Sequence, residues 1–271
     1  MHRGVVALVL MAAGLSPASA DVAAKATCKL APLDAAAVQT VVDGDTLLLT
    51  DGREVRLAGI DVPHRSTTDS TTRVAQAALE NTVSGREIAL FRLGPARDRY
   101  GRTVALVAVQ SAAPAVSMEI TQTVQWALLT QGLARVAARV GDAACATELL
   151  SAEKSARASG LGLWADPYYV IGKAEDPAGI LAARGRLAVI EGKVQSVRES
   201  GGTIYVNFGR RWSEDFTVTV PKRYERAFAA AGLTMKALAG HSVRVRGILE
   251  ARGGPWIEVT RPEQIEIAES Q

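Results

Sequence analysis

The first part of the chain alternates short apolar runs with turn signals, a pattern typical of a small domain built mainly of strands. Three strands are predicted in close succession, with an Asp51-Gly52 hairpin signal between the last two: 38–42, 46–50 and 53–60. Two further strands are predicted at 87–93 and 104–109. Helical spacing predicts three helices, at 71–84, 118–131 and 143–159. Five strands and three helices predict a compact α+β unit, mainly β, that ends near Trp164.

The last part of the chain returns to this alternation after a stretch rich in glycine and proline. That stretch, residues 165–186, predicts a linker between two domains. Beyond it the pattern predicts three strands, a helix and two strands: 187–198, 203–208, 215–220, 221–231, 242–250 and 256–267. This order is typical of a small five-stranded barrel of the oligonucleotide/oligosaccharide-binding (OB) type, so residues 187–271 are predicted to form a second, OB-like domain.

The N-terminus has the pattern of a secretory signal peptide. Residues 1–20 combine a basic start, an apolar run over 5–15 and a small-residue cleavage site at Ala18-Ser19-Ala20. We expect a mature protein that begins at Asp21, carries an N-terminal extension over 21–37, and is periplasmic or secreted. The apolar run is too short to span a bilayer, and no later stretch approaches about 18 uninterrupted apolar residues. We therefore expect a soluble protein without a membrane span.

Net charge and cysteine content exclude few classes of function. The chain has 31 Lys and Arg against 28 Asp and Glu, a formal charge of +3, so nucleic-acid binding would depend on local clusters of basic residues. Its two cysteines, Cys28 and Cys145, do not belong to a CxxC pair. In an oxidising compartment one disulfide between them is the simplest assignment, and two buried free thiols are the alternative.

One aspartate and one arginine are predicted to converge beside the hairpin. If Asp51-Gly52 forms a two-residue turn, Asp45 lies opposite Ala58 on the neighbouring strand. Side chains alternate along each strand, so Arg56 becomes a diagonal neighbour of Asp45 on the same face. A carboxylate and a guanidinium group are therefore expected at one place.

A second carboxylate is expected at the end of the third strand. Asp61 follows this strand directly, and Pro63 favours an extended conformation at Val62, so the chain leaves the sheet there. Two carboxylates, Asp45 and Asp61, together with backbone oxygens and water, suit a hard divalent cation such as Ca2+. Arginine adds bidentate donors for the oxygens of a phosphodiester, and Arg102 offers a further guanidinium group in a turn between strands.

Four short segments, taken together, carry a family resemblance. They are Val42-Asp43-Gly44-Asp45-Thr46, Arg56-Leu57-Ala58-Gly59-Ile60-Asp61-Val62-Pro63, Asp98-Arg99-Tyr100-Gly101-Arg102 and Gln131-Gly132-Leu133-Ala134-Arg135-Val136. In this order and spacing they resemble the staphylococcal nuclease (thermonuclease) family, over residues 38–164. The resemblance implies a five-stranded OB-type barrel with three helices, and a calcium-dependent nuclease that acts on DNA or RNA.

The resemblance also implies roles for individual residues. By position, Asp45 and Asp61 are calcium ligands, and the backbone carbonyl of Val62 is a third ligand. Arg56 and Arg102 match arginines that clamp the phosphate, which makes them candidate catalytic residues.

Two further positions match contacts to a substrate phosphate, and one position departs from the family pattern. Arg99 and Tyr100 are the matching residues. The glutamate that positions or deprotonates the attacking water is replaced by His64. Because an imidazole titrates near neutral pH, His64 is a candidate catalytic base, and an exposed loop histidine without a role is the alternative. Glu54 and Asp69 are other candidates for the base.

Three classes of function remain open. The first is a nuclease, the second is a nucleic-acid-binding module that has lost hydrolysis at the His64 position, and the third is an interaction protein of the cell envelope. The combination of Asp45, Arg56, Asp61 and Arg102 favours the nuclease, because a binding module has no need of a metal site. We expect nucleic acid, DNA or RNA, as the partner and a monomeric protein.

The second barrel is predicted to carry more basic than acidic residues, with Tyr205, Trp212 and Trp256 among them. Aromatic faces for bases and a basic groove for phosphates are what sequence-tolerant binding of single strands uses, so we expect this barrel to bind single-stranded nucleic acid weakly and to feed it to the nuclease domain. The alternative is a barrel whose aromatic residues fill its core and whose arginines keep it soluble.

Overall fold

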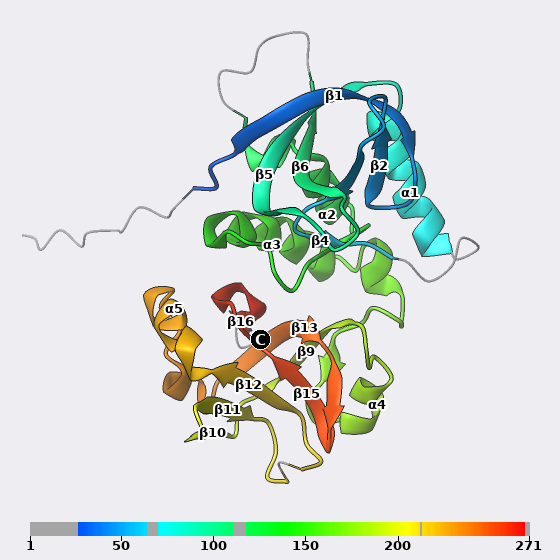
Figure 1. Cartoon of the computed structure of the whole chain (residues 1–271). Coiled ribbons are helices and arrows are strands. Elements are labelled where there is room, and N and C mark those ends of the chain that lie inside the picture. The colour runs from blue at the N-terminus through cyan, green and yellow to red at the C-terminus, as the bar shows by residue number, and fades with distance from the viewer. Residues whose placement is uncertain (1–26, 64–69, 111–117, 212, 269–271) are drawn as a thin grey trace, which may run out of the picture.

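The computed structural model describes residues 27–63, 70–110, 118–211 and 213–268, and these residues form two bodies with separate cores (Figure 1). We call residues 27–165 the barrel domain and residues 172–268 the C-terminal domain. The predicted signal peptide, the candidate bases His64 and Asp69, and Trp212 lie outside the described residues. Within the described part, no helix is both long and apolar enough to cross a membrane.

Five strands of the barrel domain close into a barrel in the order β1-β2-β3-β6-β5. Their bounds are β1 (Ala31–Val41), β2 (Thr46–Leu49), β3 (Glu54–Leu57), β5 (Glu87–Arg97) and β6 (Thr103–Val109). Neighbouring strands are antiparallel except β3 and β6, which run parallel. Apolar side chains such as Leu47, Val55 and Leu106 are fully buried and form the core of this domain.

Three helices pack against this core and confirm the predicted α+β fold. They are α1 (Ser70–Val83), α2 (Val124–Thr130) and α3 (Ala143–Ala158), accompanied by the 3-10 turns η1 (Ile120–Gln122) and η2 (Gly162–Ala165). In α1, the helical period places Ala75, Leu79 and Val83 on the buried face. A small sheet of β4 (Ile60–Asp61) and β7 (Arg135–Val136) connects the end of the barrel to the helices.

Two boundaries differ from the sequence prediction. β1 begins at Ala31 and not at residue 38, because residues 31–37 pair with β5. This half of β1, APLDAAA, contains four alanines and is exposed or half-buried throughout, so it shows no apolar alternation to detect. The second helix begins at Val124 and not at residue 118, because Thr123 is extended and its hydroxyl accepts the N–H of Trp126 as an N-cap.

The β2–β3 hairpin has a different turn from the predicted one. The N–H of Leu49 donates to the carbonyl of Arg53, so three residues, not two, form the loop. A two-residue type I′ turn needs positive φ at both central positions. Of the two residues, Gly52 has a positive φ, of 85°, and Asp51 does not. The aspartate thus holds the more favourable backbone conformation, and the glycine closes a longer loop.

The longer loop shifts the register of the hairpin by one residue. Thr46 faces Arg56 and Leu48 faces Glu54. The predicted pairing of Asp45 with Ala58 is therefore wrong. Asp45 precedes β2, and its carbonyl accepts the N–H of Leu57.

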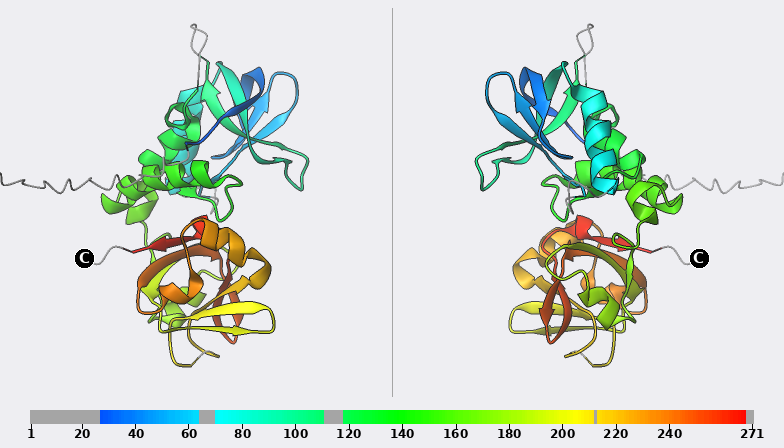
Figure 2. Two further views of the ribbon diagram at one scale, coloured as in Figure 1. Left: turned by 90° about the vertical axis from the view of Figure 1, so that its left-hand side faces the viewer. Right: turned by 90° about the vertical axis from the view of Figure 1, so that its right-hand side faces the viewer.

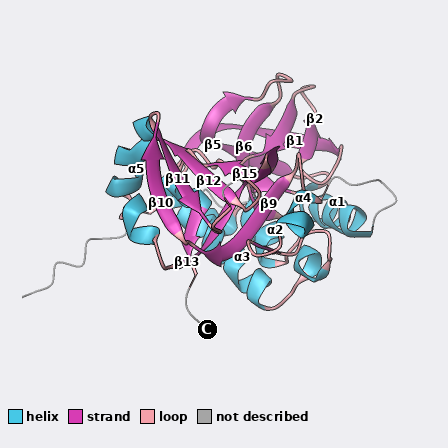
Figure 3. Ribbon diagram, turned by 90° about the horizontal axis from the view of Figure 1, so that it is seen from below, coloured by secondary structure: helices cyan, strands magenta, loops and turns pink. Residues whose placement is uncertain are grey.

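The C-terminal domain contains two sheets (Figure 3). Buried apolar side chains from both sheets form its core. One sheet has the order β10 (Ser196–Ser200), β11 (Thr203–Asn207), β12 (Thr217–Pro221), β15 (Gly254–Glu258) and β14 (Glu250–Arg252). The other has the order β16 (Ile265–Ile267), β13 (Ser242–Ile248), β9 (Leu187–Lys193) and β8 (Gly172–Lys173). Short helical segments connect them: α4 (Pro177–Leu181), η3 (Lys222–Tyr224), α5 (Glu225–Ala230), η4 (Met235–Leu238) and η5 (Pro262–Gln264).

The two sheets together contain the five strands of the predicted OB-like barrel. β11 pairs with β10 and β12, β12 pairs with β15, and β15 pairs with β14, which continues β13, the partner of β9. The predicted strand 187–198 is shared between them. The N–H of Val194 donates to the carbonyl of His241 in one sheet, and the N–H of Gln195 donates to the carbonyl of Asn207 in the other. A strand that changes sheets at a corner in this way reads as one continuous run in the sequence.

The predicted linker contributes structure to the C-terminal domain. Within it, β8 runs parallel to β9, and α4 starts at Pro177 after Asp176, whose side chain caps the helix. Ile180 of α4 is buried in the core of this domain. The glycine and proline residues of this stretch therefore mark short, sharply turned elements rather than an unstructured connection.

The structure confirms the predicted disulfide between Cys28 and Cys145. It joins the segment before β1 to the first turn of α3, across a sequence separation of 117 residues. Closing a loop of this length removes about 5 kcal/mol of conformational freedom from the unfolded chain in the loop-entropy description.

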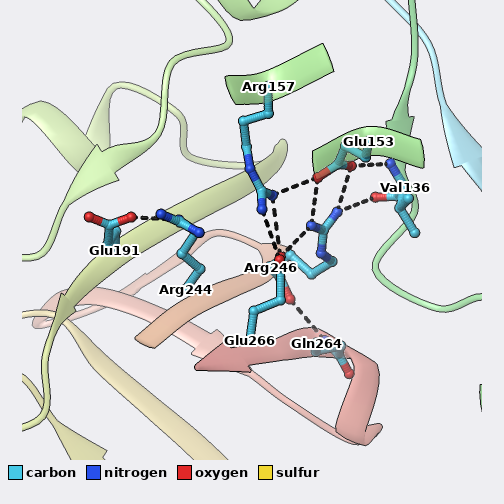
Figure 4. Close-up of polar contacts among 8 residues, drawn as sticks. All are labelled: Val136, Glu153, Arg157, Glu191, Arg244, Arg246, Gln264 and Glu266. Carbon is cyan, nitrogen blue, oxygen red and sulfur yellow. Dashed lines mark hydrogen bonds and ion pairs between the residues drawn. The ribbon is translucent and has the colours of Figure 1, made fainter. Parts of the chain in front are cut away.

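Buried ion pairs join the two domains, which lie one above the other with α3 next to the C-terminal domain (Figure 2). Arg246 of β13 donates to both carboxylate oxygens of Glu153 in α3, at 3.0 and 2.8 Å (Figure 4). Arg157 of α3 donates to Glu266 of β16 at 2.9 Å, and Arg246 also donates to the carbonyl of Val136. The side chains of Arg246 and Glu153 are 1% and 0% exposed. We call Glu153, Arg157, Arg246 and Glu266 the interdomain ion network.

Charges in the interdomain ion network stabilise one another against the cost of burial. Burial alone would raise the pKa of Glu266, but Arg246 and Arg157 outweigh it and lower the pKa to about 2. Burial alone would lower the pKa of Arg246, but Glu153 and Glu266 outweigh it and raise the pKa above its ordinary value. Arg246 and Glu266 are therefore both charged at neutral pH.

This shift predicts a dependence of stability on pH. A carboxyl group with a lowered pKa stabilises the fold above its unfolded value, here 4.5, and the contribution is lost as the pH falls through the folded value. We expect the difference in unfolding free energy between wild type and Glu266→Gln to be largest above pH 4.5 and to shrink towards pH 2. Urea unfolding at several pH values measures it. A difference that does not change with pH would contradict the prediction.

Candidate active site

Asp45 and Arg56 meet beside the β2–β3 hairpin, as the sequence predicts, although the register differs. Asp45 is 1% exposed, and its Oδ2 accepts the Nε–H of Arg56 at 3.1 Å. Its Oδ1 accepts the hydroxyl of Thr46 at 2.9 Å, and its N–H donates to the carboxylate of Asp43. The carboxylate of Asp45 is thus held in one orientation by its neighbours on both sides.

Arg102 reaches the same place from the turn before β6. Its Nη1 donates to Oγ1 of Thr46 at 3.1 Å, and its Nε donates to Oδ2 of Asp98 at 2.8 Å. Burial alone would lower the pKa of Arg102, but the hydrogen bond and charge of Asp98, with the charges of Asp45 and Asp43, raise it. Arg102 is therefore a fixed positive charge next to the Asp45 carboxylate.

Asp98 also organises the turn that carries the other two predicted phosphate contacts. Its Oδ1 accepts the N–H groups of Tyr100 and Arg102, at 2.9 and 3.1 Å. Burial alone would raise the pKa of Asp98, but the hydrogen bonds from Arg102 and from these amides lower it. Tyr100 is 67% exposed, and its ring lies 4.7 Å from Cζ of Arg99 and 5.4 Å from Cζ of Arg102. The turn therefore presents an aromatic face and two guanidinium groups together.

Asp61 lies in β4, where it is paired with a buried arginine of β7. Nη2 of Arg135 donates to Oδ2 of Asp61 at 2.8 Å and to the carbonyl of Leu187 at 3.1 Å. Cζ of Arg135 lies 5.0 Å from the ring centroid of Tyr169, and its Nε has no hydrogen-bond partner among the described residues. Arg135 thus connects Asp61 to the first residue of β9 in the C-terminal domain.

The segments that carry the two aspartates are in contact. A Cβ built on Gly44, next to Asp45, would lie 3.2 Å from Cγ2 of Val62, next to Asp61. Only glycine leaves room for this approach without displacing the valine. The contact brings the loop before β2 against the chain that leaves β4.

The predicted ligand set fits calcium in the chemistry of its donors. Asp45 and Asp61 offer carboxylates and Val62 offers a carbonyl, and all of these are hard oxygen donors. In the described ranges no three His, Cys, Asp or Glu side chains gather as a metal site, so backbone oxygens and water would have to complete the shell. Arginines occupy Oδ2 of both aspartates, but a carboxylate has about four acceptor sites, so the pairs do not exhaust it.

The predicted catalytic base is not located. His64 and Asp69 lie outside the described residues, so their roles stay predictions. Glu54, the other candidate, is exposed on β3 opposite Leu48.

Three residues that organise the site were not assigned roles from the sequence: Thr46, Asp98 and Arg135. All three lie inside the four segments of the family resemblance. Asp98 had a local signal, since an Asp that precedes a glycine turn commonly accepts backbone N–H groups. Thr46 and Arg135 had none, because their partners Arg102 and Asp61 are 56 and 74 positions away.

Comparisons with known proteins place the barrel domain in one family. A family model described as staphylococcal nuclease homologue matches residues 54–166, a range that contains Arg56, Asp61 and Arg102 and begins after Asp45. An uncharacterized endonuclease of Haemophilus influenzae is 33% identical over 133 residues, which make up 48% of this chain and 65% of that protein. Protein ParB of Escherichia coli is 31% identical over 140 residues, 49% of this chain and 73% of that protein. The chain therefore spans slightly less than two thirds of the first relative.

Proposed function

The chain belongs to the staphylococcal nuclease family, and on this premise we propose that it is a calcium-dependent nuclease that hydrolyses phosphodiester bonds of DNA or RNA. The observation that carries the proposal is the convergence of Arg56 and Arg102 on the buried Asp45–Thr46 pair. Both guanidinium groups are oriented by carboxylates, which is the arrangement that prepares donors for an anion before it arrives.

Each arginine keeps donors for a substrate. A guanidinium group has five N–H donors, of which the hydrogen bonds described above use one in Arg56 and two in Arg102. The remaining donors suit the non-bridging oxygens of a phosphodiester, whose negative charge increases as water adds to phosphorus and a P–O ester bond breaks. Calcium held by Asp45, Asp61 and the Val62 carbonyl would supply Lewis-acid polarisation of a phosphoryl oxygen.

We also propose that the protein is exported to the periplasm or beyond. The Cys28–Cys145 disulfide supports this, because such bonds persist in oxidising compartments and are rare in the cytosol. The signal-like pattern of residues 1–20 supports it independently.

Incubation of the purified protein with supercoiled plasmid and with single-stranded RNA, in calcium and in chelator, tests the proposal. We expect cleavage of at least one substrate to be about tenfold or more faster in calcium, since the metal would stabilise transition-state charge. Calcium that binds only the folded protein should also raise the midpoint of thermal unfolding, a readout that needs no cleavage. Undiminished cleavage in chelator would contradict the role of calcium.

A nucleic-acid-binding protein without hydrolysis is the second candidate. The observation that favours it is that both aspartates are paired with arginines, Asp45 with Arg56 and Asp61 with Arg135, which offsets the negative charge that attracts a cation. In that case the protein should retain plasmid in a gel-shift experiment in either condition, with no cleavage and no calcium-dependent rise in the unfolding midpoint.

A further inference from the structure

An open groove of about 780 Å³ crosses the outer face of the five-stranded sheet in the C-terminal domain. Side chains alternate between the two faces of a strand, and this alternation explains which residues line the groove. On β11, Tyr205 lines the groove while Ile204 and Val206 enter the core, and on β12, Thr219 lines the groove while Val218 enters the core. Strands β10, β11, β12 and β15 lie side by side beneath this face (Figure 3). The polar positions of the sheet are therefore gathered on one concave surface.

The floor of the groove carries a polar group that lacks a partner. Thr219 is 5% exposed, and its hydroxyl has no hydrogen-bond partner in the part of the chain that is described. It lies in the middle of the sheet, between Tyr205 on β11 and Glu258 on β15. Since buried hydroxyls are nearly always paired, this one indicates a place where a bound molecule or water supplies the partner.

Two flat surfaces face the groove. Tyr205 is 37% exposed in the middle of β11. On β15 the indole of Trp256 is covered by the guanidinium group of Arg252, whose Cζ lies 3.3 Å from the ring centroid. That distance requires the two planes to stack, so the outer face of the Arg252 guanidinium is turned away from the indole. Strands β11 and β15 are separated by β12, which puts the two surfaces about 10 Å apart across the strands.

The groove also has unpaired positive charge. Arg198 of β10 lies directly across from Tyr205, and Arg210 follows the end of β11. Neither guanidinium group forms an ion pair or hydrogen bond with the described residues. Of the two acidic residues that line the groove, Asp215 is engaged within its own loop, where it accepts the N–H of Arg211 at 2.7 Å.

We propose that this groove binds a single strand of nucleic acid, with bases stacked on Tyr205 and Arg252 and phosphates held by Arg198 and Arg210. Stacking on separate surfaces requires bases with exposed faces, which a duplex does not offer. A neutral polysaccharide could stack on the aromatic ring, but it has no negative charge to pair with Arg198 and Arg210. The choice of nucleic acid rests in addition on the proposed nuclease function of the barrel domain.

Anisotropy of a labelled single strand of about 15 nucleotides, measured with the full chain in chelator, tests the groove. We expect Tyr205→Ala and Arg252→Ala each to weaken binding about tenfold, because each removes one stacking surface. Arg198→Ala should reduce the slope of log K against log salt by about 0.7, because it removes one phosphate contact, whereas Tyr205→Ala should leave the slope unchanged.

The matched control is Arg211→Ala. This arginine is 73% exposed, pairs with Glu214 at 3.0 Å, and is not part of the groove lining, so binding should stay as in wild type. Arg102→Ala, in the proposed nuclease site, should also retain the groove's binding, which separates a failure of the nuclease proposal from a failure of this one. The groove variants should lower kcat/KM for a long single strand and leave it unchanged for a dinucleotide.

Two results would overturn the proposal. One is tight binding of the single strand that Tyr205→Ala, Arg252→Ala and Arg198→Ala all leave unaltered while circular dichroism shows them folded. The other is the absence of salt-sensitive single-strand binding, whether or not a neutral oligosaccharide quenches the tryptophan fluorescence of the protein.

Discussion

Replacing Arg102 by alanine should slow the cleavage of a phosphodiester substrate by about 100-fold or more. In the structure its guanidinium group is oriented by Asp98 and Thr46 and lies beside the buried carboxylate of Asp45. Such a preorganised donor acts on charge that develops in the transition state, so the loss should appear in kcat more than in KM. Steady-state kinetics on plasmid or RNA with saturating calcium measures the effect.

The matched control for Arg102→Ala is Arg53→Ala in the same barrel. Arg53 pairs with Asp51 and Asp34 at the exposed hairpin loop, outside the proposed site. Its replacement should change kcat by no more than about twofold, as surface substitutions do. Arg102→Lys should recover only part of the rate, because it restores the charge without the planar fork of donors. Equal rates for Arg102→Ala and Arg53→Ala would remove Arg102 from the mechanism.

Replacing Arg246 by methionine should lower the free energy of unfolding by about 3–5 kcal/mol. Methionine fits the space of the arginine stem, but the change leaves Glu153 buried at 0% exposure without its bidentate partner, and takes one of two cations from Glu266. Because these bonds join α3 to β13 and β16, the domains should also separate more readily. Urea unfolding followed by tryptophan fluorescence, with limited proteolysis between the domains, measures both effects.

Arg244→Met on the same strand is the control for Arg246→Met. Arg244 pairs with Glu191 where both side chains remain partly exposed, so its loss should cost about 1 kcal/mol or less. The double variant Arg246→Met with Glu153→Gln should be more stable than Arg246→Met alone, because it removes a buried carboxylate that has lost one of its two cations and keeps only Arg157. A cost for Arg246→Met as small as that for Arg244→Met would contradict a role for the interdomain ion network in holding the domains together.

Much of the architecture could be predicted from local patterns. Apolar alternation, the Asp51-Gly52 hairpin signal and the helical spacing around Leu79 indicated an α+β domain of five strands and three helices, and the family resemblance implied that the strands form a barrel. The helical spacing also included Val74, which is 53% exposed on the outer face of α1. Errors arose where a local signal fits two outcomes. Asp51-Gly52 suits loops of two or three residues, and the backbone conformation of Asp51 selects the longer one. The alanine-rich segment before Val38 shows no alternation, although pairing with β5 makes it a strand.

Part of the candidate site could likewise be predicted from local sequence, and part could not. The order of the segments in the sequence was enough to bring Asp45, Arg56 and Arg102 forward as one site, because close spacing and motif order carry that information. The partners of Asp61 and Glu153 emerged only in the folded protein.

Arg135 lies 74 positions from Asp61, and Arg246 lies 93 positions from Glu153. No local pattern encodes such pairs, because a charge attracts its partner strongly only after packing has removed both from water. Periodicity and motif order thus determine which elements and which chemistry the chain contains. The packing of the two domains determines which charges meet, and through Arg135 it ties the candidate calcium ligand Asp61 to the first strand after the predicted linker.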